Sequence, residues 1–454
     1  IQSERVEPGT EVEAVGQVHQ EGSWVLEHAL FRKVAPDLPA AAPADPAGPL
    51  ASVAAIRALS QTEAARGREV VIQGMVTWSL PESDVFFLHT IMGSVRVYYD
   101  RTKTGVIPYG KYFTVKGVTR VGLTVPGVEL REYVDLGSMS HPKARPISYE
   151  EAMTGQLDAE WVELRGFLQY TESEGDWRWI HVMTPGGKFV GHLQSPVNFV
   201  ANPGSLIRVQ GVCEVKLGPE GRVADFILRV PFLHDITIEQ DAPADPFDLP
   251  RRSLDELELL SGGGQMQRVR VAGTVLHQTT SGQVFLADGR SGLRIISTGK
   301  QPLQPGDRIE AVGILGREGV NVVLRDALYR RTSGGPAPVP AVLADLQEAH
   351  PGQDLKLVSV RGILQDVFRG PQLTRLTLQQ GPARFEALLD RSVAPSPDRL
   401  KPTAELELTG IYQVNFDDTR QARGFQILLR SPADIRVVVP ARLWTLQRAL
   451  SVAV

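Results

Sequence analysis

The chain has 454 residues, of which 42% are hydrophobic and 22% charged, so it has enough apolar material for packed cores and does not have the composition of a disordered chain. Its formal net charge is −4, with acidic and basic residues interspersed, which argues against a protein that binds nucleic acid through a basic surface. The single cysteine, Cys213, excludes an internal disulfide and a cysteine-rich metal site.

One pattern occurs about four and a half times along the chain. A short β-branched run that ends in glycine occurs at Gly74, Gly166, Gly273 and Gly362, and a second such run follows 40 to 48 residues later at Gly117, Gly211, Gly313 and Gly410. An extra copy of the second run ends at Gly16. Because the period is roughly 90 to 107 residues, longer than a solenoid repeat, each copy is expected to be a small domain.

The third copy illustrates the strands that each domain should contain. Alternating runs at 268–278, 283–288 and 292–297 are separated by turn residues, and two more runs follow at 308–315 and 320–329. Five short strands in about 65 residues, grouped three plus two, predict a five-stranded barrel of the OB type. We interpret the glycines within the runs as points where a barrel strand bends.

Short helices are predicted between the barrels. Ser148 with Glu151, and Ser253 with Glu256, have the spacing of a capping box. Residues 52–67 and 342–350 occupy the equivalent places in the other copies.

Proline-rich stretches separate the copies and are interpreted as semi-rigid linkers, at residues 36–49, 242–250 and 334–340. The predicted fold is therefore all-β with short helices, a tandem array of small five-stranded OB-like barrels joined by these linkers. The expected OB-like domains are 50–143, 144–241, 246–333 and 338–440. Residues 1–35 should be the C-terminal part of another barrel, either loosely ordered or completed by strands from elsewhere.

The sequence offers no constellation for catalysis. No two of the nine histidines have the spacing of a helix-borne zinc pair, and nucleophile-elbow, phosphate-loop and dinucleotide motifs are not found. No acid–base pair can be singled out among the many carboxylates. We expect no enzymatic activity, no cofactor and no metal.

One segment could form a binding surface. Strand alternation places Trp177, Trp179 and His181 on one face and Arg178 on the other, and the next strand carries Lys188 and His192. Stacking rings near a cation suit a sugar, a nucleotide or an anionic aromatic compound. The alternative is that these rings are buried between the second barrel and a neighbour.

The layout resembles the repeated OB-like modules in the extracytoplasmic part of certain bacterial membrane-bound sensor histidine kinases. The runs that carry this resemblance are Val-Phe-Leu-Ala-Asp-Gly at 284–289, the run Pro-Gly-Asp-Arg-Ile-Glu-Ala-Val-Gly at 305–313, and its counterpart at 8–16. The turns at 109–111 and 401–403 depart from the pattern. These motifs concern turns and strands, so no functional residues are carried over from the family.

The resemblance also implies a location. In that family the modules precede a transmembrane helix, often opened by a basic, tryptophan-containing stretch, and residues 441–454 look like the start of this juxtamembrane segment. The chain is then expected to be a piece of a longer periplasmic, membrane-anchored protein whose anchor follows Val454. No run of about 20 apolar residues occurs within the chain itself.

Three functions compete at this stage. The leading hypothesis is a non-catalytic sensing or interaction region of a signal-transduction protein, which binds an unknown small ligand or protein and could form a homo-oligomer. The second is an array that binds single-stranded nucleic acid, which the net charge disfavours. The third is a structural spacer or scaffold.

Overall fold

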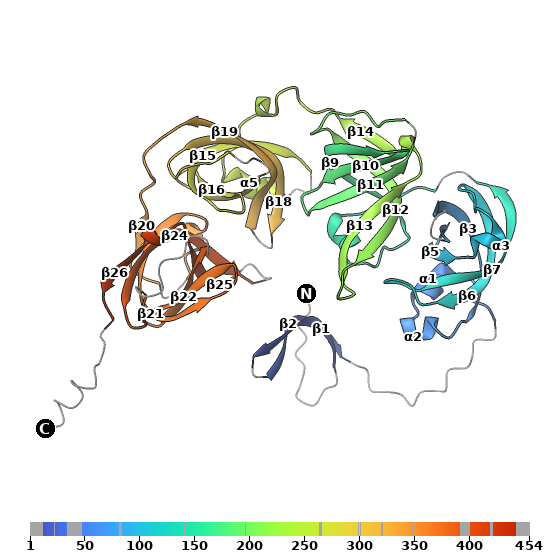
Figure 1. Ribbon diagram of the computed structural model, residues 1–454, viewed down its shortest axis with the longest axis horizontal. Helices are drawn as coiled ribbons and strands as arrows, with labels where there is room; N and C mark the ends of the chain where they lie inside the picture. Colours follow the sequence, from blue (N-terminus) through green and yellow to red (C-terminus); the bar gives the residue numbers. More distant parts are fainter. Residues whose placement is uncertain are drawn as a thin grey trace. The chain divides into compact units, whose positions relative to one another are not determined.

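The computed structural model forms two units, Ile1–Pro49 and Leu50–Val454, each treated separately below (Figure 1). The structure describes residues 12–21, 23–33, 48–80, 84–139, 142–195, 197–262, 266–297, 299, 301–318, 321–346, 349–390, 400–417 and 421–441. In the first unit, β1 (Val12–Glu21) pairs antiparallel with β2 (Ser23–Lys33) as a two-stranded sheet, and the register shifts between Val15 and Gln17, at the repeat glycine Gly16.

The second unit contains four five-stranded barrels with one topology. In each, the strands close in the order first, second, third, fifth, fourth and back to the first, and the third and fifth strands run parallel. The strands of the first and second barrels are β3 (Glu69–Leu80), β4 (Val85–Thr90), β5 (Gly93–Tyr98), β6 (Lys111–Arg120) and β7 (Gly127–Ser138), then β9 (Trp161–Glu174), β10 (Trp177–Met183), β11 (Lys188–Gln194), β12 (Leu206–Leu217) and β13 (Val223–Val230).

The third and fourth barrels repeat this arrangement, with β15 (Arg268–Gln278), β16 (Gln283–Ala287), β17 (Gly292–Ser297), β18 (Arg308–Glu318) and β19 (Asn321–Ser333), then β21 (Leu357–Arg369), β22 (Leu373–Gln380), β23 (Ala383–Asp390), β24 (Glu405–Phe416) and β25 (Ala422–Leu429). Short outer strands extend the second and fourth barrels: β8 (Arg145–Pro146), β14 (Ile236–Gln240), β20 (Ala341–Leu343) and β26 (Ile435–Val439). The predicted tandem array of OB-type barrels is confirmed.

The repeat glycines lie in the first and fourth strands of the barrels, where two strands come very close together. A Cβ atom on Gly410 would lie 2.5 Å from the carbonyl oxygen of Leu428 on the neighbouring strand. The corresponding distance for Gly273 is 2.7 Å, to the carbonyl oxygen of Ala287. Such contacts are far inside van der Waals range, so Gly410 and Gly273 have no room for a side chain.

A second feature that recurs in the four barrels is the turn before each fourth strand, where a residue with positive φ donates its amide to the first strand. The four bonds are Gly110 to Val76 (2.9 Å), Gly204 to Leu168 (2.7 Å), Gly306 to Val275 (2.9 Å) and Thr403 to Leu364 (2.8 Å). The turns at 109–111 and 401–403, which depart from the motif in sequence, therefore keep its geometry. Thr403 does so at φ +73°, a conformation that normally favours glycine.

The helices are short: α1 (Val53–Arg57), α2 (Gln61–Ala64), α3 (Arg101–Thr104), α4 (Tyr149–Met153) and α5 (Glu256–Gly262), with 3-10 turns η1 (Leu233–Asp235), η2 (Pro246–Asp248), η3 (Pro351–Gln353) and η6 (Pro432–Asp434). The capping box of Ser148 and Glu151 is confirmed.

Two helix predictions need correction. The helix α5 begins at Glu256, so Glu256 is its first residue and cannot close a capping box with Ser253. The helix expected at 342–350 is wrong for the described part of that range, which contains β20 instead. There Val342 pairs with Ser359 on β21, and Pro351 disfavours helical backbone at the residue before it.

The proline-rich stretches that the structure describes pack on the third barrel. In 242–250, the carbonyl of Phe247 accepts a hydrogen bond from Arg270 (2.6 Å), and the Arg330 guanidinium lies 4.2 Å from the centre of the Phe247 ring. Residues 334–340 pass over the turn at Gly306, where a Cβ would lie 2.5 Å from the Pro336 carbonyl oxygen. The stretch 36–47 lies outside the described residues.

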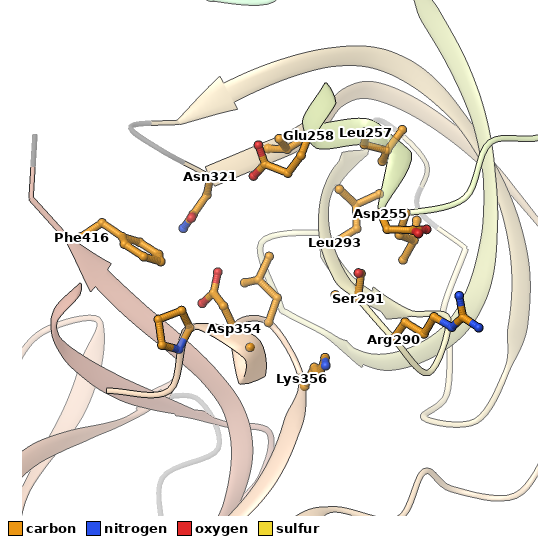
Figure 2. Close-up of a pocket in the computed structure, with 16 residues that line it drawn as sticks. Asp255, Leu257, Glu258, Arg290, Ser291, Leu293, Asn321, Asp354, Lys356 and Phe416 are labelled. Carbon is orange, nitrogen blue, oxygen red and sulfur yellow. The ribbon is translucent and has the colours of Figure 1, made fainter. Parts of the chain in front are cut away.

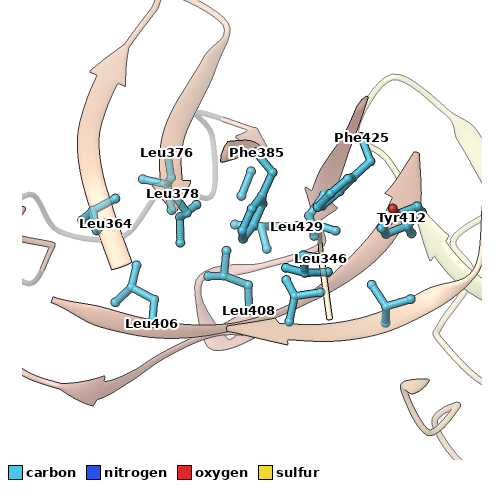
Figure 3. Close-up of a cluster of buried hydrophobic side chains, with 14 of the residues drawn as sticks. Leu346, Leu364, Leu376, Leu378, Phe385, Leu406, Leu408, Tyr412, Phe425 and Leu429 are labelled. Carbon is cyan, nitrogen blue, oxygen red and sulfur yellow. The ribbon is translucent and has the colours of Figure 1, made fainter. Parts of the chain in front are cut away.

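Each barrel is filled by its own cluster of apolar side chains. In the fourth barrel, the rings of Phe385, Phe425 and Tyr412 stack in a row, with centroids 5.2 and 4.7 Å apart, among leucines such as Leu406 and Leu408 (Figure 3). A fully buried Leu or Phe contributes about 1.5–3 kcal/mol each, so these clusters supply the main favourable contribution to folding. Cys213 is buried in the second cluster, and burial raises the pKa of its thiol.

Candidate functional site

Five aromatic side chains gather on the outer surface of the second barrel, on strands β9, β10 and β11. We call Tyr170, Trp177, Trp179, His181 and His192 the aromatic face. The His192 ring stacks on both tryptophans, with centroids 4.0 Å from Trp179 and 4.2 Å from Trp177. His192 is only 6% exposed, whereas both tryptophans remain half-buried. The predicted rings of β10 and β11 are therefore brought together on one surface.

The aromatic face extends to β9 through a second stack. Tyr170 is opposite His181 in the antiparallel register, and their rings lie 4.2 Å apart at an angle of 17°. The carboxylate of Glu172 is 3.6 Å from Nε2 of His181. Sequence reasoning missed Tyr170, although it lies four residues after Gly166, as Trp78 lies four residues after Gly74.

The electrostatic environment keeps His192 neutral. A guanidinium N–H of Arg229 donates to Nδ1 of His192, and Nε of Arg229 is 2.6 Å from the Glu214 carboxylate. Burial, reinforced by the charge of Arg229, lowers the pKa of His192 to about 4. A neutral imidazole between two indole rings gives a flat apolar stack at neutral pH.

The two predicted cations are placed differently from the rings. Arg178 points to the opposite side of β10, as strand alternation predicts, and its Nη1 donates to the carbonyls of Gly175 (2.6 Å) and Trp177 (2.9 Å). Its side chain therefore braces the hairpin. Lys188 is exposed at the other end of β11, opposite Met183 and four residues from His192.

Trp177 also packs at the junction between the first and second barrels. It packs against an apolar cluster that joins the first and second barrels and contains Phe87 and Trp161. Trp179 and His181 are half-buried and Tyr170 is 47% exposed. The aromatic face thus begins at the junction of two barrels and continues onto an accessible surface.

Two cavities of the second unit are each lined by residues of two consecutive barrels. One, of about 690 Å³, is lined by residues of the second and third barrels, among them Arg165 and Glu239, whose charged groups are 3.1 Å apart. The other, of about 350 Å³, is lined by residues of the third and fourth barrels, including Glu258, Asp354 and Lys356 (Figure 2).

Other functional features were sought in the part of the chain that the structure describes. There, no three His, Cys, Asp or Glu side chains gather as metal ligands would. Every helix of the described ranges falls short of the length and apolarity that a membrane crossing requires.

Comparison with known proteins identifies no family for this chain. No family model matches the chain, and no curated protein does. Similar solved structures include Entamoeba histolytica aspartyl-tRNA synthetase (19% identity, TM-score 0.16, 21% of this chain and 22% of that one) and Pyrococcus horikoshii asparaginyl-tRNA synthetase with asparaginyl-adenylate (17%, 0.18, 22% and 23%). A murine DNA-binding protein bound to double-stranded DNA is also similar (12%, 0.22, 38% and 98%).

The chain spans less than a quarter of the length of either synthetase. With TM-scores of 0.16 to 0.22, these similarities support no conclusion about the function of this chain.

Proposed function

We propose that this chain is the non-catalytic, extracytoplasmic sensing region of a bacterial signal-transduction protein, of the sensor histidine kinase type that its modules resemble, and that the aromatic face binds its ligand. The observation that supports a binding role is the stack of Trp177, His192 and Trp179 on the outer surface of β10 and β11. OB barrels bind their ligands on the face of these second and third strands. A half-buried double-tryptophan stack at that place suits a ring-shaped ligand.

The charges around the rings favour a neutral ligand over a phosphate-bearing one. Glu172 lies beside His181, and the positive charge of Arg229 is already engaged by Glu214 and His192. A phosphate brought to the tryptophan stack would therefore meet the Glu172 carboxylate, which is opposite Trp179, whereas the exposed cation of Lys188 lies at the other end of β11. We infer that the ligand is a sugar or an oligosaccharide, whose apolar ring face can lie on an indole.

The experiment is a thermal-shift titration of the whole chain with cellotetraose and chitotetraose. At least one of these should raise the melting temperature of the wild type, and Trp179→Ala should remove the shift while the variant remains folded. Phe368→Ala is the matched control because Phe368 is an exposed ring on β21 of the fourth barrel. If the sugars stabilise Trp179→Ala as much as the wild type, the aromatic face is not the site.

Single-stranded nucleic acid is the second candidate, favoured by the same stacked rings because bases stack on aromatic side chains. A labelled dT12 oligonucleotide at low salt tests it, since binding through phosphates must weaken steeply with salt. Salt-sensitive binding that Trp179→Ala abolishes would replace the sugar by a nucleic acid in this proposal. If neither sugar nor oligonucleotide binds, a spacer role is favoured.

A further inference from the structure

The junction between the third and fourth barrels repeats the junction between the first and second. Phe87 on β4 packs against Trp161 in one apolar cluster. Phe285 on β16 packs with Leu357 in another. Trp161 and Leu357 each lie five residues before a repeat glycine of their own barrel. The two junctions can therefore be compared position by position.

The loop that leads into each receiving barrel is held by an aspartate. Asp158 and Asp354 both lie eight residues before a repeat glycine. The carboxylate of Asp158 accepts the amide of Val215 at 3.0 Å, and that of Asp354 accepts the amide of Val414 at 2.8 Å. Both valines lie on the fourth strand of their barrel, four residues after its repeat glycine. The two aspartates thus have the same place and the same backbone partner.

Both loops also contain a strained residue directly after the aspartate. Ala159 has φ +73° and Leu355 has φ +56°, a region that side chains rarely adopt. Such backbone persists only where the surrounding contacts hold it in place. In the second junction the contact is very close, since a Cβ atom on Gly292 would lie 2.4 Å from the carbonyl oxygen of Leu355. The contacts of each aspartate therefore help to fix its loop against the preceding barrel.

Each preceding barrel carries an arginine at the same place. Arg96 is directly opposite Phe87 in the register of β4 and β5, and Arg294 is directly opposite Phe285 in that of β16 and β17. In the first junction, Nη2 of Arg96 lies 2.9 Å from Oδ1 of Asp158. A buried ion pair thus joins the first barrel to the second.

The arginine of the second junction pairs within its own barrel instead. Arg294 forms an ion pair with Glu318 on β18, and the same carboxylate lies 2.9 Å from Arg325. Glu318 lies five residues after a repeat glycine, and the first barrel has Gly122 at that position. The third barrel therefore offers its arginine a carboxylate that the first barrel does not have there.

Asp354 has no such ion pair. It lines the cavity of about 350 Å³ between the third and fourth barrels (Figure 2), and burial raises its pKa. Arg294 is the cation whose charge acts on this carboxylate, but it does not offset the burial. Lys356 stands at the position of Glu160, whose carboxylate is 3.4 Å from Arg57 in the first junction. The place that Arg96 takes beside the aspartate is therefore not the place of Lys356.

Four charged groups, Arg294, Arg325, Glu318 and Asp354, can be paired in two ways. In the arrangement described above, two arginines share Glu318 and none pairs with Asp354. In the other, Arg294 bonds to Asp354 while Arg325 stays on Glu318, so that each carboxylate has one arginine. The second arrangement gains an ion pair, but the desolvation of a guanidinium beside a buried carboxylate opposes this gain. The two arrangements should therefore lie close in free energy.

We infer that Arg294 is a two-position latch of the junction between the third and fourth barrels. With Arg294 on Glu318 the junction is released, and the cavity beside Asp354 is open. With Arg294 on Asp354 the fourth barrel is held as Arg96 holds the second. A packed interface with two discrete arrangements can convert a small local change into a movement of whole domains. The inference goes beyond the proposed ligand site and does not depend on it.

The test follows hydrogen exchange at the Val414 amide of the whole chain, because this amide donates to Asp354. Glu318→Gln removes the competing carboxylate, so Arg294 should move to Asp354. Exchange at Val414 should then slow about tenfold, which corresponds to about 1.4 kcal/mol for one charge-assisted contact.

Glu310→Gln is the matched control. Glu310 lies on the same strand as Glu318 and also holds two arginines, Arg270 at 2.5 Å and Arg330 at 2.8 Å. Its replacement removes the same charge without freeing Arg294, so exchange at Val414 should stay at the wild-type rate. An equal slowing in both variants would overturn the inference, because the loss of any carboxylate would then suffice.

Arg294→Met completes the test. Alone it should leave exchange at Val414 close to the wild-type rate, and combined with Glu318→Gln it should cancel the slowing. In the first junction, Arg96→Met should instead speed exchange at Val215, because that ion pair is already formed.

Three further results would each overturn the inference. Unchanged exchange in Glu318→Gln, or a slowing that survives the removal of Arg294, would show that Arg294 has no second position. Faster exchange at Val414 in Arg294→Met alone would show that Arg294 already holds Asp354. The sugar response at Trp179 is independent of each of these outcomes.

Discussion

Arg96 on β5 of the first barrel and Asp158 of the second form a buried ion pair, with Nη2 2.9 Å from Oδ1. The two side chains are 8% and 1% exposed, so this pair is almost fully removed from water. Burial alone would lower the pKa of Arg96, but the adjacent Asp158 carboxylate raises it above its ordinary value. Glu214, 3.8 Å from Arg96, connects the pair to Arg229 and so to the aromatic face.

Removing the Arg96 side chain should therefore lower the unfolding free energy substantially. Arg96→Ala leaves the Asp158 charge buried without its partner, and we expect the unfolding free energy of the first two barrels to fall by about 3–5 kcal/mol. Urea unfolding followed by tryptophan fluorescence measures this, since these barrels contain the tryptophans of the junction. Arg361→Ala is the control, because Arg361 is 53% exposed in its pair with Glu407 and should cost less than about 1 kcal/mol. A comparable loss in both variants would contradict the role given to burial.

The turn at Thr403 offers a stabilising substitution. A non-glycine residue at φ +73° destabilises the folded state by about 1–2 kcal/mol. Replacing it by glycine removes this strain but costs about 0.5–1 kcal/mol, because glycine has more conformational freedom to lose when the chain folds. Thr403→Gly should therefore stabilise the fourth barrel by about 0.5–1 kcal/mol, measured as a higher midpoint of its unfolding transition. The reciprocal change, Gly110→Thr, should destabilise the first barrel, because Gly110 has φ +77°. A Cβ atom at Gly110 would meet nothing within 4 Å, so this loss would come from backbone strain and not from a steric clash. An unchanged or lower midpoint for Thr403→Gly would show that the turn is not strained.

Much of the fold could be predicted from the sequence because its signals are local. The repeat glycines such as Gly273 mark positions where two strands touch, and the turn around Gly306 recurs at a fixed place in each copy, so strand number and grouping follow from spacing. The helix expected at 342–350 failed for a tertiary reason, since Val342 pairs with β21 in the fold.

The candidate site was predictable only in part. Alternation along one strand places Trp177 and Trp179 on the same face, but the stack with His192 depends on the register between β10 and β11. The surroundings of Arg57 could not be anticipated, because it bonds to Asp158, 101 residues away in the chain. Contacts between barrels leave no periodic signal in a single sequence.

The strand glycines give a prediction with a matched pair. Gly410→Ala places a methyl group 2.5 Å from a backbone carbonyl oxygen that cannot move without disturbing β25, and we expect it to destabilise the fourth barrel by about 2–4 kcal/mol. Gly424→Ala, on β25 of the same barrel, meets nothing within 4 Å and should change stability by less than about 0.5 kcal/mol. Chemical denaturation of the two variants makes the comparison. Equal tolerance of both changes would refute the close-approach account.

The last prediction concerns pH. Burial, followed by nearby arginines, lowers the pKa of His192 and of His277 from 6.5 to about 4 in the folded protein. In the unfolded chain both histidines take up protons near pH 6.5, whereas the folded protein does not until about pH 4, so protons bind preferentially to the unfolded state between these values. Stability should therefore be full above about pH 6.5 and should decline as the pH falls toward 4.

Measurements of the unfolding free energy between pH 7 and 5 isolate this effect. Carboxylates with lowered pKa, such as Asp100 at about 2 in the folded state against an ordinary 3.8, lose their stabilising contribution only at lower pH. His192→Gln and His277→Gln should each flatten the decline, and the double variant should remove most of it. Because His192 lies in the aromatic face, its protonation also places a positive charge between Trp177 and Trp179, so the proposed sugar binding should weaken only when the pH approaches 4. A decline of the same steepness in the double variant would assign the pH dependence to other groups.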